Sequence, residues 1–341
     1  MTVRGGSSDQ EMHVEIHAMR EALRGALRER TVRLEGVQIS GVQKGVHVTG
    51  GGTLTMNQGS IEFKGNGYGV YVGKGVTKAD LTGTKITGEG KGVGVYAMGG
   101  RTMVMALTDV KISGVGMGIF AAGGGMLAIG GTSTIGFQGK YGVYVGGEMT
   151  AKLTKTVITG SGEAVRSGTG VYVNGGAAWL GGTTLKSVAK GMTVENGIVV
   201  MQNGVIKFHG EHGVLLKQGN ALLVNVGMKY EGNNADTTFL KVDATEGANK
   251  ADIKGALIKI DGQGKGLGVH VMNGGRVMLK NTVLANVVKG VDVFFRRYVS
   301  FIFAFTFCFL RDVCLYSIFY LIDLFFLFWG MCLALFIRLL C

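Results

Sequence analysis

Gly69-Val70-Tyr71-Val72 and Gly142-Val143-Tyr144-Val145 are two copies of a four-residue phrase that decides the fold of this chain: glycine, apolar, variable, apolar. The phrase begins at ten glycines, whose positions are 45, 69, 94, 118, 142, 170, 191, 213, 268 and 290. Eight of the nine steps between them measure 21 to 28 residues, and the step of 55 holds a degenerate copy at 239–242. The chain therefore repeats a unit of about 24 or 25 residues roughly eleven times.

Each unit also contains two further short apolar segments, for example 54–56 and 61–63, which follow breaks rich in glycine or asparagine. Alternation with a period of two, together with β-branched residues, predicts strands, whereas the helical period is absent. A three-strand unit of this length cannot bury its apolar face alone, so successive units must stack. The sequence predicts an all-β, right-handed parallel β-helix of about eleven rungs over residues 31–293.

The third position of the phrase is predicted to face outward, because the second and fourth positions are apolar in all ten copies and belong in the core. On five successive rungs this outward position is aromatic. Exposed aromatic rows can bind glycans or proteins, which makes these residues the candidate binding surface. The alternative is that stacked aromatic side chains merely stabilise in-register parallel strands. The five residues are Tyr71, Tyr96, Phe120, Tyr144 and Tyr172.

The first 30 residues are predicted to form a separate N-terminal segment. Apolar residues at 12, 16, 19, 23 and 27 share one face of a helix over 9–29, and Ser8 with Glu11 has the spacing of a capping box. We expect this amphipathic helix to cover the open end of the β-helix; lying on a membrane surface is the alternative. No apolar run in 1–30 resembles a secretory signal peptide.

Residues 294–341 differ in composition from everything before them. They hold 12 of the 17 Phe and all four Cys of the chain. Apolar stretches within 298–337 are long enough for one or two membrane-spanning helices, so this hydrophobic tail is a candidate membrane anchor. The alternative is that the tail is the product of a frameshift, since out-of-frame translation can generate such sequence.

The repeat domain shows no catalytic, metal or cofactor motif. Polysaccharide lyases and hydrolases of this architecture need carboxylates gathered on one face, and here the acidic residues are scattered over different units. His209 and His212 lack a third nearby ligand, so we expect no metal, and the Gly-x-Gly runs never complete a nucleotide-binding motif. The net charge is +12, but the lysines of the repeat domain are spread singly, so we expect no nucleic-acid partner.

The GVYV phrases at Gly69, Gly142 and Gly170, with Ile-Thr-Gly closings at 86–88 and 158–160, resemble the passenger segments of bacterial autotransporters. The resemblance implies the pectin-lyase-like β-helix, export to the outer membrane or cell surface, and a role as a virulence-related surface protein whose partner is a host-surface protein or glycan. The chain departs from that pattern because it shows neither a signal peptide nor the alternating strands of a C-terminal barrel.

The function expected from these observations is non-enzymatic binding by a surface-displayed, adhesin-like rod. Two alternatives stay open. One is a nonfunctional remnant of a passenger gene, suggested by the tail. The other is a polysaccharide lyase or hydrolase, suggested by analogy of fold alone and recognisable by carboxylates gathered in a cleft.

Overall fold

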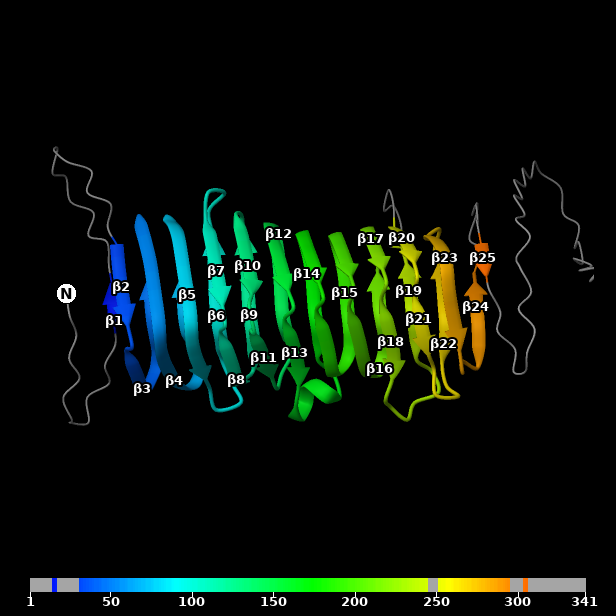
Figure 1. Cartoon of the computed structure of the whole chain (residues 1–341), viewed down its shortest axis with the longest axis horizontal. Coiled ribbons are helices and arrows are strands. Elements are labelled where there is room, and N and C mark those ends of the chain that lie inside the picture. Colours follow the sequence, from blue (N-terminus) through cyan, green and yellow to red (C-terminus); the bar gives the residue numbers. More distant parts are fainter. Residues whose placement is uncertain (1–13, 17–30, 245–250, 295–302, 306–341) are drawn as a thin grey trace, which may run out of the picture.

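The structure, a computed structural model, describes residues 14–16, 31–244, 251–294 and 303–305. These residues form one elongated stack of parallel strands, whose rungs follow one another along the long axis (Figure 1). The described part contains a single helix, the short 3-10 helix η1 (Gly162–Val165). The predicted all-β parallel solenoid of about eleven turns is therefore confirmed. The right-handed sense stays a prediction, in line with the general rule for connections between parallel strands.

The strands run through the whole described chain, and each turn of the solenoid contributes up to three of them; where the chain bends without interruption, two or three merge into one long strand. Their bounds are β1 (Val14–Ile16), β2 (Thr31–Glu35), β3 (Gln38–Val48), β4 (Gly52–Val72), β5 (Val76–Thr87), β6 (Val93–Gly99), β7 (Val104–Thr108), β8 (Lys111–Val115), β9 (Met117–Gly123), β10 (Met126–Gly130), β11 (Thr134–Phe137), β12 (Tyr141–Thr154), β13 (Val157–Gly160), β14 (Thr169–Gly181), β15 (Thr184–Gln202), β16 (Val205–Leu216), β17 (Gly219–Val224), β18 (Gly227–Tyr230), β19 (Thr238–Asp243), β20 (Ala251–Ala256), β21 (Lys259–Asp261), β22 (Leu267–Met272), β23 (Arg276–Ala285), β24 (Lys289–Val293) and β25 (Phe303–Phe305).

The core is built by stacking like residues from successive turns. Val70 of β4 pairs with Val95 of β6, which pairs with Ile119 of β9, and all three side chains are fully buried. The second and fourth positions of the phrase therefore face the interior, as predicted. Since each apolar side chain is covered by its counterparts on the neighbouring turns, the solenoid has one continuous core along its length.

The glycine of the phrase is required by space and not only by turn formation. A Cβ atom on Gly118 would lie 2.3 Å from the carbonyl oxygen of Gly142 and 2.3 Å from Cγ2 of Ile135. The equivalent atom on Gly191 would lie 2.3 Å from the oxygen of Gly213. Adjacent turns thus approach so closely at Gly118 and Gly191 that no side chain fits at these positions, which explains the glycine there.

The long step in the repeat holds a turn without the phrase glycine. Strand β19 pairs with β16 on one side and β22 on the other, which places Phe239 where other turns have glycine and buries it completely. The degenerate copy predicted at 239–242 is therefore one regular turn of the stack.

The two ends of the chain fall mostly outside the described residues. Within the predicted helix at 9–29, the structure describes Val14–Ile16, which form strand β1 beside β3. Within the predicted membrane tail it describes Phe303–Phe305, which form strand β25 beside β23. The helix and the membrane anchor otherwise stay predictions. Among the described residues, no helix has the length and apolar character needed to cross a membrane.

Candidate functional site

Two neighbouring rows of outward side chains run along one face of the solenoid. The aromatic row consists of the third positions of the phrase, from His47 to Tyr172, and the flanking row consists of the residues just before the phrase glycines. The rows touch, because the ring of Tyr141 in the flanking row lies 5.6 Å from that of Tyr144 and 4.6 Å from that of Tyr172, measured between centroids. A ligand on this face therefore meets both rows.

The aromatic row is a continuous stack of rings. Centroids from Tyr71 to Tyr172 are 4.6 to 5.5 Å apart and their planes differ by 6 to 17°, with His47 stacked on Tyr71 at the other end. Each inner ring is therefore covered on both faces and offers only its edge to a ligand. Tyr172 differs, since its partner on the next turn is Thr193, which has no ring. The binding role predicted for the row stays a prediction.

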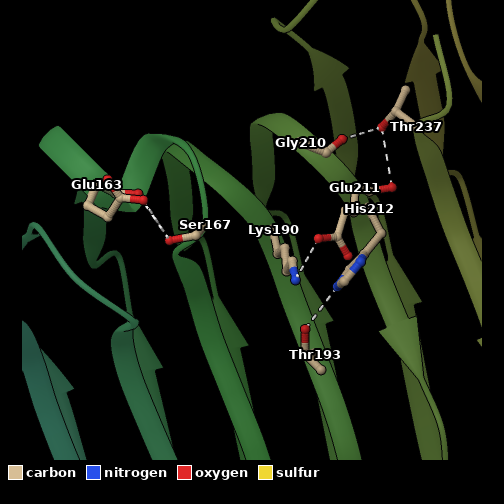
Figure 2. Close-up of polar contacts among 8 residues, drawn as sticks. All are labelled: Glu163, Ser167, Lys190, Thr193, Gly210, Glu211, His212 and Thr237. Carbon is tan, nitrogen blue, oxygen red and sulfur yellow. Dashed lines mark hydrogen bonds and ion pairs between the residues drawn. The ribbon is translucent and has the colours of Figure 1, made fainter. Parts of the chain in front are cut away.

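On the two turns that follow Tyr172, the rows carry the polar residues Lys190, Thr193 and His212 (Figure 2). Lys190 of β15 and His212 of β16 are register partners in the flanking row, and Nζ of Lys190 lies 2.9 Å from Oε1 of Glu211. Oγ1 of Thr193 and Nε2 of His212 form a hydrogen bond of 2.9 Å. Thr193 occupies the outward position of its phrase and is nevertheless buried, because His212 from the next turn packs beside it. The expectation that every third position is exposed is therefore wrong at Thr193.

The corner that carries Glu211 and His212 is held from the following turn. Oγ1 of Thr237 donates a hydrogen bond of 2.7 Å to the carbonyl oxygen of Gly210, the residue before Glu211, as Figure 2 shows. On the other side of Lys190, the turn containing Glu163 and Ser167 lies next to β15, and their side chains form a hydrogen bond of 3.4 Å. The backbone around Lys190 and Glu211 is thus supported from both neighbouring turns.

The site brings three positive and three negative side chains together around a buried histidine. Burial, followed by the positive charges of Lys190, Lys241 and Lys217, lowers the pKa of His212 to about 3. His212 is therefore neutral at physiological pH, and the three lysines lie around it. Each lysine has a carboxylate partner: Glu211 for Lys190, Glu195 for Lys217 at 3.0 Å, and Asp243 for Lys241 at 3.9 Å. We call these three ion pairs with Thr193 and His212 the basic cluster.

Tyr172 links the aromatic row to the basic cluster. Burial raises the pKa of its hydroxyl, and the nearby negative charge of Glu195, together with a hydrogen bond to that carboxylate, raises it further. The hydroxyl of Tyr172 is therefore protonated at any physiological pH and can act as a proton donor. The phenol is therefore joined to the ion pair between Glu195 and Lys217 through the carboxylate of Glu195.

Sequence reasoning missed most of this cluster. It judged the lysines to be spread singly, and it considered His212 only with His209, as half of a metal site. In the parts of the chain that the structure describes, no three His, Cys, Asp or Glu residues are grouped to hold a metal ion. Alignment of the repeats at the phrase glycine carried the missing signal, because it places Lys190 and His212 in one row beside Thr193.

The fold is similar to that of a known enzyme. The crystal structure of alginate lyase from Paenibacillus sp. str. FPU-7 superimposes with a TM-score of 0.55 at 15% sequence identity, covering 75% of this chain and 99% of the other. No protein-family model and no curated protein matches the sequence. The likeness shows a parallel β-helix of the pectin-lyase-like kind; it does not show an autotransporter passenger.

This comparison corrects the functional expectation. The sequence favoured a non-enzymatic, adhesin-like rod, with a polysaccharide lyase or hydrolase as the less favoured alternative. The solved structure with this fold belongs to a polysaccharide lyase, so the alternative fits the finding and the non-enzymatic interpretation was wrong. The reason for the error is chemical: unpaired carboxylates gathered in a cleft were the expected signature of an enzyme, whereas on the described face each carboxylate of the cluster is paired with a lysine.

Proposed function

We propose that this chain is a polysaccharide lyase that cleaves an acidic polysaccharide built of uronic acids, such as alginate, at the basic cluster. The observation that carries the proposal is Lys190, a lysine with a side chain only 26% exposed on the turn between that of the protonated Tyr172 and that of the neutral His212. Support comes also from the fold shared with an alginate lyase.

The reaction we propose is β-elimination. The hydrogen on C5 of a uronate leaves as a proton to a water molecule that acts as the base, the bond between C4 and the glycosidic oxygen breaks, and a double bond forms between C4 and C5. The proton taken up by water later restores the hydroxyl that has protonated the leaving oxygen. The leaving oxygen takes up a proton, and no water enters the products. The difficult step is the loss of the C5 proton, because negative charge develops on the carboxylate next to it, so a cation at that carboxylate lowers the barrier.

Two residues take named roles in this scheme. Lys190 binds the uronate carboxylate and stabilises the charge that develops on it. Tyr172, whose hydroxyl keeps its proton, supplies the proton to the leaving oxygen. His212 and Thr193 act as positioning residues, because their hydrogen bond fills the space beside Lys190 without adding a charge. The aromatic row leads up to this point, and its last ring, Tyr172, is the part of the predicted stripe that the reaction uses.

The substrate class follows from charge. Three lysines converge on His212, and the whole chain carries a net charge of +12, which favours a polyanion over a neutral glycan. A uronate polymer supplies a carboxylate on each sugar, so binding releases counterions and weakens with salt. β-Elimination also removes the need for the paired carboxylates that hydrolysis requires.

We further propose that the reaction takes place at the cell surface. The likeness of the repeat to autotransporter passengers supports this location, and a polymeric substrate is more readily met outside a cell than inside it.

The test is an assay for the unsaturated sugar that only elimination produces, which absorbs ultraviolet light. The full chain is incubated with alginate and with other polyuronates. We expect product from the parent protein, a loss of at least about 100-fold in Lys190→Met, and a smaller loss in Tyr172→Phe. Lys254→Met, which removes an exposed lysine on another face, is the matched control and should retain activity. Absence of product from the folded parent protein, or full activity in Lys190→Met, would contradict the proposal.

A further inference from the structure

We propose that Glu211 is a placeholder carboxylate: it forms an ion pair with Lys190 in the protein without substrate, and the carboxylate of a bound uronate displaces it. The inference rests on the proposed function, because it concerns the same lysine. It assigns Glu211 a role in selecting the substrate, whereas the proposed reaction itself uses Lys190 and Tyr172.

The two partners of this ion pair differ in their surroundings. The Lys190 side chain is 26% exposed, whereas that of Glu211 is 69% exposed. The lysine is therefore held by packing on the face of the solenoid, and the glutamate reaches it from the solvent side (Figure 2). Since a surface ion pair is weak and its exposed partner is free to rotate, Glu211 can swing into water while Lys190 stays in place.

The backbone beneath Glu211 does not need to move for this exchange. Thr237 holds the carbonyl of Gly210, and His212 is buried against Thr193. The residues on both sides of Glu211 are thus fixed by hydrogen bonds to other turns. Only its side chain has to rotate, which keeps the site formed while Lys190 changes its partner.

The neighbouring pair, Lys217 with Glu195, is built differently. The Glu195 side chain is only 29% exposed, and it also accepts a hydrogen bond from the hydroxyl of Tyr172. Releasing Glu195 would cost two interactions in a less exposed setting, so this pair stays closed. Of these two lysines, Lys190 is therefore the one whose carboxylate partner a substrate can replace more easily.

The exchange selects for carboxylated sugars. A uronate replaces one carboxylate on Lys190 by another, so the lysine keeps a charged partner. A neutral sugar offers no such replacement, and opening the pair for it would leave Lys190 without one. The same argument implies that Glu211 competes with the substrate for Lys190. Neutralising Glu211 should therefore tighten the binding of a polyuronate.

The experiment compares Glu211→Gln with Glu148→Gln. Glu148 is a matched control, since its side chain is also 69% exposed and it forms an ion pair, at 3.2 Å, with Arg101 several turns away. Binding of alginate and of a neutral glucan is measured by calorimetry with the full chain carrying Lys254→Met as the common background, and KM and kcat are measured by the absorbance of product.

For Glu211→Gln we expect alginate to bind about 5-fold more tightly, with KM falling by a similar factor. Its affinity should also fall more steeply with salt, because a new ion pair forms where the parent protein exchanges one for another. Glu148→Gln should show neither change beyond the small effect of net charge, and the glucan should respond to neither variant.

Unchanged or weaker alginate binding by Glu211→Gln would overturn the inference. If the glutamine variant does not fold, Glu211→Ala gives the same comparison, since both substitutions remove the competing charge. The outcome is separate from that of the proposed function. If the parent protein is inactive and its Glu211→Gln variant binds alginate more tightly, the placeholder role is supported and the lyase activity is contradicted. If the parent protein is active and Glu211→Gln does not change KM, the lyase activity is supported and the placeholder role is contradicted.

Discussion

The turns that carry Tyr71 to Tyr172 and the turns that carry Lys190 to Lys241 place their side chains on the same face, on strands in continuous register. In the first region the outward side chains satisfy one another, since each ring stacks on the next at 4.6 to 5.5 Å. In the second region, charged and polar side chains from different turns converge on a buried, neutral histidine. In the first region the outward rings contact one another, whereas the second region has charged groups that a ligand can bind.

The comparison shows that in a solenoid different positions of the repeat determine the fold and the surface chemistry. Both regions use the phrase glycine for the same purpose. A Cβ atom on Gly118 in the first region, or on Gly191 in the second, would lie 2.3 Å from the carbonyl oxygen of the next turn, which is too close for any side chain. The outward positions are free of that constraint. They can therefore change from an aromatic residue, Tyr172, to a hydroxyl-bearing one, Thr193, within one turn while the two residues stay in register.

The largest expected effect lies in the second region and depends on pH. His212 has a pKa of about 3 in the folded chain and an ordinary value of 6.5 in the unfolded chain. Above pH 6.5 both states are neutral; as the pH falls below 6.5 the unfolded chain gains a proton that the folded chain does not. The free energy of unfolding should therefore fall, by up to about 1.4 kcal/mol per pH unit, until pH nears 3. Urea titrations from pH 7 to pH 4 measure this slope.

The control for that slope is His212→Gln, which keeps a polar side chain but cannot take up the proton. We expect the variant to be less stable than the parent protein at pH 7 and to lose less stability on acidification. Parallel pH curves for the two proteins would show that His212 is not the group responsible.

The next effect tests whether the two regions share one backbone constraint. Gly118→Ala and Gly191→Ala should each lower the free energy of unfolding by about 1 to 3 kcal/mol, because the added methyl group overlaps the next turn. Gly130→Ala is the control, since a Cβ there meets nothing within 4 Å. Chemical denaturation compares the three. A cost in only one region, or a similar cost at position 130, would contradict a shared constraint.

A smaller effect is expected where the two regions meet. Thr193→Val keeps the shape of the side chain but removes the hydroxyl that bonds to Nε2 of His212, so a buried nitrogen loses its partner. This should cost about 1 to 2 kcal/mol. Thr193→Ser, which retains the hydroxyl, should recover part of the loss in the same denaturation experiment. Equal losses in both variants would mean that packing of the methyl group, and not the hydrogen bond, matters there.

The smallest effect is expected inside the aromatic row. Phe120→Leu keeps an apolar side chain and removes two stacking contacts, with Tyr96 and Tyr144, which should cost about 1 kcal/mol. The rate of product formation should not change, because the basic cluster lies several turns away. A strong loss of activity with unchanged stability would show instead that the row itself binds substrate.

Much of the fold could be predicted because residues that contact each other in a solenoid lie about one turn, roughly 24 residues, apart in the sequence. The spacing of the phrase glycines predicts which residues become neighbours, and alternation predicts which side chains are buried; Val70 and Val95 follow both rules. The degenerate turn at Phe239 could be located by counting alone. The helix at 9–29 and the membrane tail rest on local patterns outside the described residues and stay predictions.

The site was harder to predict because it depends on contacts between turns. Thr193, His212 and Glu211 look ordinary one at a time, and only stacking places the histidine against the threonine and the glutamate against Lys190. Residue type alone pointed to carboxylate pairs and passed over single lysines, although the place of each lysine in the rows could be derived from the same glycine register.

By itself the sequence determined the repeat, the direction in which each core residue points and the positions of the aromatic row, because these follow from a period of two within strands and of about 24 residues between turns. Only the tertiary structure decided which of the outward residues act together. The neutrality of His212 and the ion pair between Lys190 and Glu211 arise from burial and proximity across turns, and the energy of a charge depends on its surroundings rather than on its place in the chain.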